Sequence, residues 1–217
     1  MSAKAILYDY WRSSASYRVR IALNMLGREY DRVPVDLLSQ EHKGIDHLCR
    51  NPQGLVPTLA IDGHMMTQSL AIIEYLNESH PEARFLPDDP LGRQRVRALS
   101  YAIAMEIHPV CNLGVASHVM QLAGGDEAAR RNWMHKFISE GLGAFETMLD
   151  HPETGHFCHG DTPSMADFCL VPQVFNARRW GAKIERLERV NAIAARCDAI
   201  GAFAAAHPDR LRPGSPR

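Results

Sequence analysis

The chain has 217 residues, of which 46% are hydrophobic, and its 24 basic and 25 acidic side chains give a formal net charge of -1. This length and apolar content suit one large buried core or two smaller ones. The balanced charge provides neither the basic surface that binds nucleic acid nor a polybasic membrane patch, so the expected partners are small molecules or a second copy of the chain.

Five cysteines, an odd number with no C-x-x-C pair, argue against a disulfide framework and against a thiolate zinc site. The tract His156-Phe157-Cys158-His159 has too few neighbouring ligands to indicate a metal, so we expect none. The first ten residues hold only a short apolar run that includes Asp9, which fits neither a signal peptide nor a membrane span. We therefore expect reduced thiols, a cytoplasmic location and no membrane contact.

The first eighty residues alternate strand and helix patterns in the order β-α-β-β-β-α, with a weakly patterned segment between the second and third strands. Gly27 ends the first helix, and the dipeptide Asp62-Gly63 predicts a hairpin turn between the last two strands. The predicted strands are residues 5–8, 29–33, 56–61 and 64–67, and the predicted helices are residues 16–26 and 68–81.

Three prolines and several charges between Pro81 and Gly92 indicate a linker, after which the chain is helical almost to its end. The sequence thus predicts an α/β domain over residues 1–82, a linker over 83–92 and an all-helical domain over 93–217. Ser164 and Asp167 have the spacing of a capping box, and the C-terminal residues are expected to fray. The helical patterns cover residues 93–121, with an interruption at His108-Pro109, then 126–149 and 164–180.

The turn after the first strand passes from Ser13, Ser14 and Ser16 directly into an amphipathic helix. Backbone N–H groups at a helix N-terminus lack intrahelical partners and carry the positive end of the helix dipole. A thiolate, carboxylate or phosphate would be stabilised there without a metal. The alternative is that these serines only cap the helix.

Four motifs stand along the chain: YDYWRSSASYRVRIAL at 8–23, NPQGLVPTLAIDG at 51–63, QSLAIIEYL at 68–76 and GDTPSMADFCLVPQV at 160–174. Together they resemble the zeta-class glutathione transferases, and the resemblance covers nearly the whole chain. It implies a thioredoxin-like N-terminal domain, an all-helical C-terminal domain, glutathione as cofactor and a homodimer. It also implies a cis peptide bond before Pro57, whereas the residues alone favour a trans turn, since only about 5–6% of X-Pro bonds are cis.

By this resemblance, Ser14 donates to the glutathione sulfur, with Ser13 and Arg12 as its catalytic neighbours. The Val56 main chain would pair with the cysteinyl part of glutathione. Gln68 and Ser69 would receive the γ-glutamyl carboxylate, and His42 would hold the glycyl end. The residues expected to contact the cofactor are Ser13, Ser14, Ala15, Ser16, Tyr17, Arg18, His42, Val56, Pro57, Gln68, Ser69, His108 and Asn112.

The implied reaction is the cis-trans isomerisation of maleylacetoacetate to fumarylacetoacetate, by reversible addition of the glutathione thiolate. Two substrate carboxylates favour arginine, whose planar fork makes bidentate pairs. Arg12 and Arg179 are the expected ligands, with Arg178 as the adjacent alternative. Other possible activities are maleylpyruvate isomerisation, glutathione transfer to small halogenated acids, and glutathione binding without turnover.

Two positions depart from the zeta-class pattern, with Ala15 where the family has cysteine and Tyr17 where it has tryptophan. Because the attacking sulfur belongs to glutathione, the loss of the protein cysteine leaves the expected nucleophile in place. Ala15 keeps maleylpyruvate open as a substrate. Against it, Leu113-Gly114 lacks the arginine that maleylpyruvate isomerases can present after the asparagine.

Overall fold

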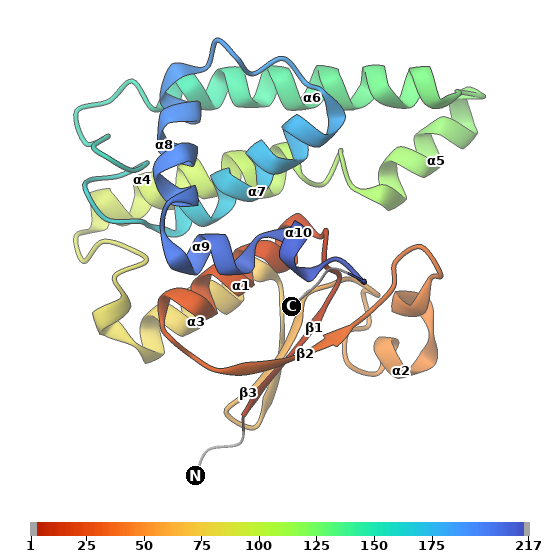
Figure 1. The fold of residues 1–217 in the computed structure, drawn as a ribbon, viewed down its shortest axis with the longest axis horizontal. Helices are drawn as coiled ribbons and strands as arrows, with labels where there is room; N and C mark the ends of the chain where they lie inside the picture. Colours follow the sequence, from red (N-terminus) through yellow and green to blue (C-terminus); the bar gives the residue numbers. More distant parts are fainter. Residues whose placement is uncertain (1–3, 215–217) are drawn as a thin grey trace. The chain divides into compact units, whose positions relative to one another are not determined.

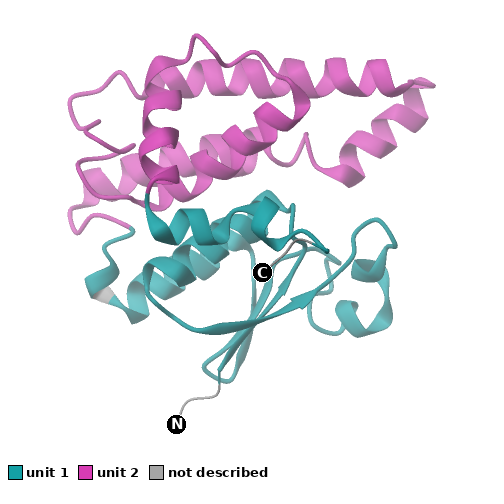
Figure 2. Ribbon diagram, in the orientation of Figure 1, with its two compact units in different colours: residues 1–85, 200–217 teal, residues 86–199 magenta. Residues whose placement is uncertain are grey.

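The computed structural model describes residues 4–214, which form two compact units (Figure 2). Unit 1 contains residues 4–85 and 200–214, and unit 2 contains residues 86–199. The sequence analysis assigned residues 93–217 to the helical domain, whereas the segment that starts at Ile200 groups here with the N-terminal unit. The reason is side-chain bonding that no local pattern reveals, because Arg20 and Asn24 donate to the backbone carbonyls of this segment.

Unit 1 is built around a four-stranded sheet with the strand order β2-β1-β3-β4. β1 is parallel to β2 and antiparallel to β3, and β3 is antiparallel to β4. The strands are β1 (Ala5–Asp9), β2 (Tyr30–Pro34), β3 (Thr58–Ile61) and β4 (His64–Thr67). The helices are α1 (Ser14–Met25), η1 (Glu41–Lys43), α2 (Ile45–Leu48), α3 (Ser69–Ser79), η2 (Pro81–Ala83), α9 (Gly201–Ala206) and α10 (Pro208–Leu211).

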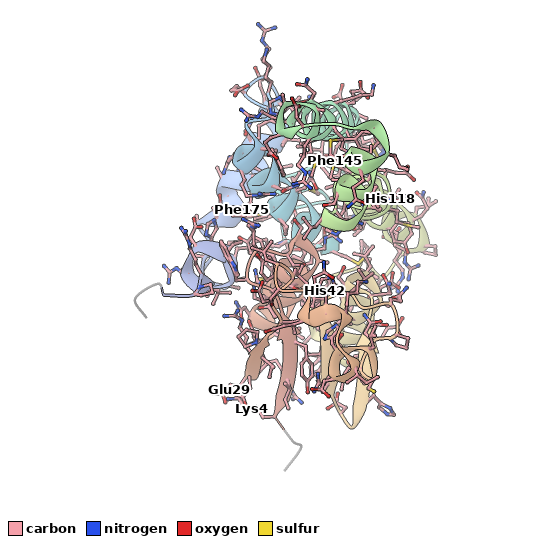
Figure 3. All side chains as sticks on the ribbon, turned by 90° about the vertical axis from the view of Figure 1, so that its right-hand side faces the viewer. Lys4, Glu29, His42, His118, Phe145 and Phe175 are labelled. Carbon is pink, nitrogen blue, oxygen red and sulfur yellow. The ribbon has the colours of Figure 1, made fainter. Side chains whose placement is uncertain are left out.

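This arrangement is the thioredoxin-like fold that the resemblance implies. Helices α1 and α3 pack against each other, and α9 lies along α1 (Figure 1). The core between sheet and helices is apolar, with fully buried Leu7, Val19, Leu23, Leu59 and Ile73. The parallel pairing of β1 and β2 brings Lys4 and Glu29 to the same end of the sheet, as Figure 3 shows.

The predicted turn between β3 and β4 is confirmed. Asp62 and Gly63 both have positive φ angles, 51° and 79°, which suit a tight hairpin. The first helix begins at Ser14, two residues earlier than predicted. The short helices η1 and α2 were not predicted, since helices of three or four residues are too short to show a helical period.

Unit 2 is entirely helical over its described elements. They are α4 (Pro90–Tyr101), the π-helix η3 (Ala102–Ile107), α5 (Leu113–Ala123), α6 (Glu127–Met148), α7 (Met165–Trp180) and α8 (Glu188–Asp198). The expected linker is shorter than predicted, because Asp89 caps α4 through a bond from the Gly92 N–H (2.7 Å) and helix begins at Pro90. The predicted interruption at His108-Pro109 is confirmed, because regular helix stops after Ile107.

The start of α7 confirms the predicted capping box. The Asp167 carboxylate accepts hydrogen bonds from the Ser164 N–H and hydroxyl and from the Cys158 N–H, at 2.8, 2.9 and 2.9 Å. Asp167 is fully buried, and this burial raises its pKa above the usual value although the hydrogen bonds act in the opposite direction. Three buried acceptor contacts on one side chain make this helix start a rigid part of unit 2.

All five cysteines are free, and all except Cys49 are buried. Burial raises the pKa of the Cys111 thiol to about 11, and it raises the pKa of Cys158 well above its usual value. These thiols are therefore protonated and unreactive at neutral pH. Between residues 4 and 214, no helix is both long and apolar enough to cross a membrane.

Candidate functional site

The strand register brings three separate chain segments to one end of the unit 1 sheet. Tyr8 in β1 pairs with Thr58 at the start of β3, and Thr58 pairs with Thr67 at the end of β4. Three segments therefore meet at this end of the sheet: the turn after β1, the residues before β3 and the residues after β4. These are the segments in which the sequence predicts the serines, Val56-Pro57 and Gln68-Ser69.

The three serines of the first turn have different surroundings. Ser13 is the N-cap of α1, and its Oγ accepts a hydrogen bond from the Ser16 N–H at 3.2 Å. Ser14 is the first helical residue, and its hydroxyl has no hydrogen-bond partner among the described residues. The capping role thus applies to Ser13. The Ser14 hydroxyl and the first N–H groups of α1 are available to an anion.

The chain before β3 offers an extended backbone edge. The Val56-Pro57 peptide bond is cis, as the resemblance implies. The N–H and C=O of Val56 make no hydrogen bond to any residue between 4 and 214. An extended peptide ligand could pair with these groups in the manner of an added strand.

The position of this edge depends on two residues that the sequence analysis missed. Asn51 donates from Nδ2 to the Leu55 carbonyl at 2.9 Å, and His47 Nε2 lies 2.9 Å from the same oxygen. Both side chains are buried and hold the chain immediately before Val56. An available signal was Asn51 followed by Pro52, a typical start of a β-turn.

The start of α3 is a second place for an anion. Gln68 adopts φ 67° and ψ 105°, a strained conformation for a residue other than glycine, and no side chain caps the helix. The Ser69 hydroxyl accepts a hydrogen bond from Arg18 Nη1 at 3.3 Å. Arg18 and Ser69 are both buried, so this bond joins the two helix starts. Gln68 itself is exposed and donates to Gln53 Oε1 at 2.7 Å.

A buried ion-pair network, also missed by the sequence analysis, holds the first turn. Asp9 accepts hydrogen bonds from Arg20 Nη1 and Arg32 Nε, both at 2.7 Å. Arg20 and Asp9 are fully buried, and Arg20 also donates from Nη2 to the Trp11 carbonyl at 3.0 Å. The sequence shows that Asp9 directly follows a predicted strand, but it does not show which arginines pair with it. Removing one partner of such a pair typically costs about 3–5 kcal/mol, so the network gives the turn a single conformation.

The other predicted residues of the first turn and helix have varied positions. Ala15 and Arg12 are partly exposed, and the Arg12 guanidinium lies over the Trp11 ring at 5.5 Å and the Tyr10 ring at 6.0 Å. The side chain of Tyr17 is buried and packs edge-on against His207. This packing does not support the prediction that Tyr17 contacts the cofactor.

His42 lies in η1, at the end of the unit 1 sheet opposite to Lys4 and Glu29 (Figure 3). It is therefore at the end of the sheet where β1 terminates. Burial and the neighbouring Lys43 lower the pKa of His42, so its imidazole is neutral at pH 7 and contributes hydrogen-bonding atoms without a positive charge.

The break between η3 and α5 carries the two predicted unit 2 residues, His108 and Asn112. Asn112 is the N-cap of α5, and its Oδ1 accepts a hydrogen bond from the Val115 N–H at 2.8 Å. Trp133 Nε1 donates to the Val110 carbonyl at 2.9 Å, and this bond anchors the segment between His108 and Asn112. His108 is half-buried at the end of the π-helix, a helix type that is common at functional sites.

Arg178 and Arg179 near the end of α7 are both exposed but differently placed. Arg178 Nη1 lies 3.8 Å from the Asp198 carboxylate. Arg179 stacks over Trp180 at 4.7 Å and donates to Asn176 Oδ1 at 3.2 Å. The two neighbouring guanidinium groups therefore face different surroundings, an aromatic ring and an amide for Arg179 and a carboxylate for Arg178.

The described residues of the His156–His159 tract have structural partners. Arg95 donates to the Cys158 carbonyl at 2.7 Å and approaches His159 Nδ1 at 3.3 Å. No group of three or more His, Cys, Asp or Glu side chains within residues 4–214 is placed to hold a metal ion.

Comparison with known proteins identifies relatives over nearly the full length. Residues 3–78 match the family described as Glutathione S-transferase, N-terminal domain. The chain is 64% identical over 213 residues to the maleylacetoacetate isomerase of Rhizobium meliloti, covering 98% of this chain and 100% of that protein.

Solved structures give the same result. A holo structure of maleyl pyruvate isomerase, described as a bacterial glutathione-S-transferase in zeta class, has a TM-score of 0.93 at 40% identity and covers 97% of this chain and 100% of that one. Maleylacetoacetate isomerase of Methylobacterium extorquens AM1, solved with bound malonate and GSH, has a TM-score of 0.92 at 36% identity, with 98% and 100% coverage.

Proposed function

Because this chain belongs to the zeta class of the glutathione transferases, we propose that it catalyses the glutathione-dependent cis-trans isomerisation of maleylacetoacetate to fumarylacetoacetate. The relative with 64% identity carries the name of this activity. Maleylpyruvate is the alternative substrate, because a maleyl pyruvate isomerase has a TM-score of 0.93 with this chain.

The residues of unit 1 fit glutathione, an extended peptide with a thiol and two carboxylates. The free N–H and C=O of Val56 suit its peptide backbone. The uncapped start of α3 with Ser69 suits the γ-glutamyl carboxylate, and neutral His42 would hold the glycyl end. We propose contacts to glutathione also for Ser13, Ala15, Ser16, Pro57 and Gln68 in unit 1 and for His108 and Asn112 in unit 2.

The single observation that carries the proposal is the Ser14 hydroxyl at the start of α1, without a hydrogen-bond partner among the described residues. A hydroxyl donor and the positive helix end both favour a thiolate over a thiol. When glutathione is bound, its thiolate supplies the nucleophile that reversible addition to the maleyl double bond requires. Ser13 holds the helix start as its cap, and the Asp9 and Arg20 pair keeps the turn in place.

We propose that Arg12 and Arg179 hold the substrate carboxylates. Arg12 stands in the same turn as Ser14, and Arg179 is an exposed arginine near the end of α7. The relative solved with bound malonate and GSH binds a dicarboxylate together with glutathione. This combination supports a diacid substrate for the present chain.

The Ser14→Ala variant tests the proposal. We expect kcat/KM with maleylacetone to fall about 100-fold, the size of effect seen when one donor to a developing anion is removed. The apparent pKa of bound glutathione, followed by thiolate absorbance against pH, should rise. Ser79→Ala is the control, because it removes an exposed serine hydroxyl at the other end of α3 and should leave that pKa unchanged.

Two results would contradict the proposal. The absence of glutathione-dependent isomerisation in the unmodified protein would reject the activity, and turnover of halogenated acids instead would indicate a general transferase. An unchanged pKa in Ser14→Ala would remove Ser14 from its role. Comparing kcat/KM for maleylacetoacetate and maleylpyruvate decides which substrate is preferred.

We further propose that the protein is a homodimer in the cytoplasm. Large apolar side chains remain exposed on both units, among them Met65 (44%), Tyr101 (37%) and Met105 (59%). Exposed apolar side chains of this kind would be covered where a second copy of the chain binds. Analytical ultracentrifugation should give twice the chain mass of 24.3 kDa, and a monomer at micromolar concentration would contradict the dimer.

A further inference from the structure

The C-terminal segment lies along α1 in the reverse direction. Asn24 Nδ2 donates to the Ala202 carbonyl at 3.0 Å, and Arg20 Nε donates to the Ala206 carbonyl at 3.1 Å. One turn earlier in α1, the Tyr17 ring meets His207 with 6.1 Å between ring centroids. Successive contacts thus pair earlier residues of α1 with later residues of the segment. Figure 1 shows α9 and α10 beside α1.

This direction brings Arg212 to the turn after β1. The Arg212 guanidinium carbon lies 5.9 Å from the centroid of the Trp11 ring, and that of Arg12 lies 5.5 Å from the same centroid. Both distances are within the range of a cation–π contact. Two arginines from opposite ends of unit 1 therefore share one indole, directly before Ser13 and Ser14.

Neither guanidinium forms an ion pair or hydrogen bond with any residue between 4 and 214. Two positive charges on one ring repel each other, and an anion placed between or beside them would relieve that repulsion. Planar guanidinium groups match carboxylates best, because they can donate two parallel hydrogen bonds.

We propose that Arg212 is a substrate-binding residue that holds a carboxylate of the maleyl diacid together with Arg12. This rests on the proposed function, and it deepens it by giving the C-terminal segment a part in substrate selection. Glutathione is the less suitable occupant, because the start of α3 and His42 are already available for its two carboxylates. The segment is thereby more than a frayed tail, since its bonds to α1 determine where Arg212 stands.

The test compares Arg212→Ala with Arg210→Ala, which removes an exposed arginine of α10 two residues away; the cation–π contacts to Trp11 come from Arg12 and Arg212. For Arg212→Ala we expect the KM for maleylacetone to rise about 10-fold, with kcat and the KM for glutathione changed less than twofold. Arg210→Ala should match the unmodified protein. Arg212→Lys should recover only part of the loss, because an ammonium group is a point charge without the planar fork.

A binding measurement makes the test independent of turnover. Calorimetric titration with malonate in the presence of saturating glutathione should show weaker binding to Arg212→Ala than to Arg210→Ala. Equal malonate affinity in the two variants would overturn the inference, as would a change confined to glutathione affinity. If the unmodified protein fails to isomerise maleylacetone, the proposed function fails, while the malonate titration still decides the role of Arg212.

Discussion

Arg178 and Arg179 are neighbours in the sequence, but their guanidinium groups have different partners. Arg178 lies 3.8 Å from the Asp198 carboxylate, whereas Arg179 stacks on Trp180. An exposed ion pair of this kind contributes about 0–1 kcal/mol to stability, so Arg178 has a modest structural role. Arg179 also donates to Asn176 Oδ1 at 3.2 Å, a bond within its own helix.

Arg179 is the arginine of this pair that we propose as a ligand of a substrate carboxylate, and this role gives a prediction for substrate binding. Arg179→Ala should raise the KM for maleylacetone about 10-fold or more, since a charge-assisted hydrogen bond is worth about 1.5–3 kcal/mol. Arg178→Ala should change that KM less than twofold and serves as the matched control. Steady-state kinetics at saturating glutathione measure both values. A larger effect in Arg178→Ala would exchange the roles of the two residues.

At the scale of elements, a single glycine sets how closely two helices of unit 2 approach. Gly141 lies in α6, and a methyl group added to it would overlap the side chain of Ile107 at the end of the π-helix η3. Ile107 is buried, so it has little room to move. The fit of Ile107 against this glycine fixes the end of η3, and His108 follows directly.

Gly141→Ala should therefore destabilise the protein. Overpacking costs about 1–3 kcal/mol, and the higher helix propensity of alanine offsets about 1 kcal/mol of that cost. Gly143→Ala is the control in the same helix, because nothing lies within 4 Å of its added methyl group. That variant should be neutral or more stable. Urea unfolding measures both. Combining Gly141→Ala with Ile107→Val should recover part of the loss, and an additive result would show that the two side chains do not interact.

At the scale of the whole molecule, stability in weak acid depends on partly buried imidazoles. Burial lowers the pKa of His42 below its ordinary 6.5, and the same cause lowers the pKa of His159. The unfolded chain therefore takes up these protons first as the pH falls. Both groups support stability above about pH 6.5. They lose that contribution as the pH falls below this value toward their folded pKa values.

The prediction is that the unmodified protein loses more unfolding free energy between pH 7.5 and about pH 5.5 than His42→Gln does, because glutamine does not titrate. Urea unfolding curves at each pH measure the unfolding free energy of both proteins. Subtracting one from the other cancels the contributions of the titrating groups that the two proteins share. Identical pH dependence would mean that His42 is solvated like an unfolded histidine. A steeper loss in the variant would reverse the sign of the argument.

Much of the architecture follows from the sequence because its signals are local. Alternating strand and helix patterns, the Asp62-Gly63 turn and the Ser164 to Asp167 spacing each act within a few residues. The prediction of an anion site is local in the same way, since serines before an amphipathic helix indicate such a site by their order alone. The cis bond before Pro57 needed the family resemblance, because local preference favours the trans form.

Long-range contacts were decided only by the tertiary structure. Asp9 meets Arg32 across 23 residues, Arg20 reaches Ala206 across 186, and Arg212 shares the ring of Trp11. No local pattern encodes such pairs, because the residues become neighbours only after the sheet and α1 have formed. The sequence by itself determined which of the longer helices and strands form, because their patterns are local. Only the tertiary structure decided the packing of the C-terminal segment on α1, which brings Arg212 to the ring of Trp11.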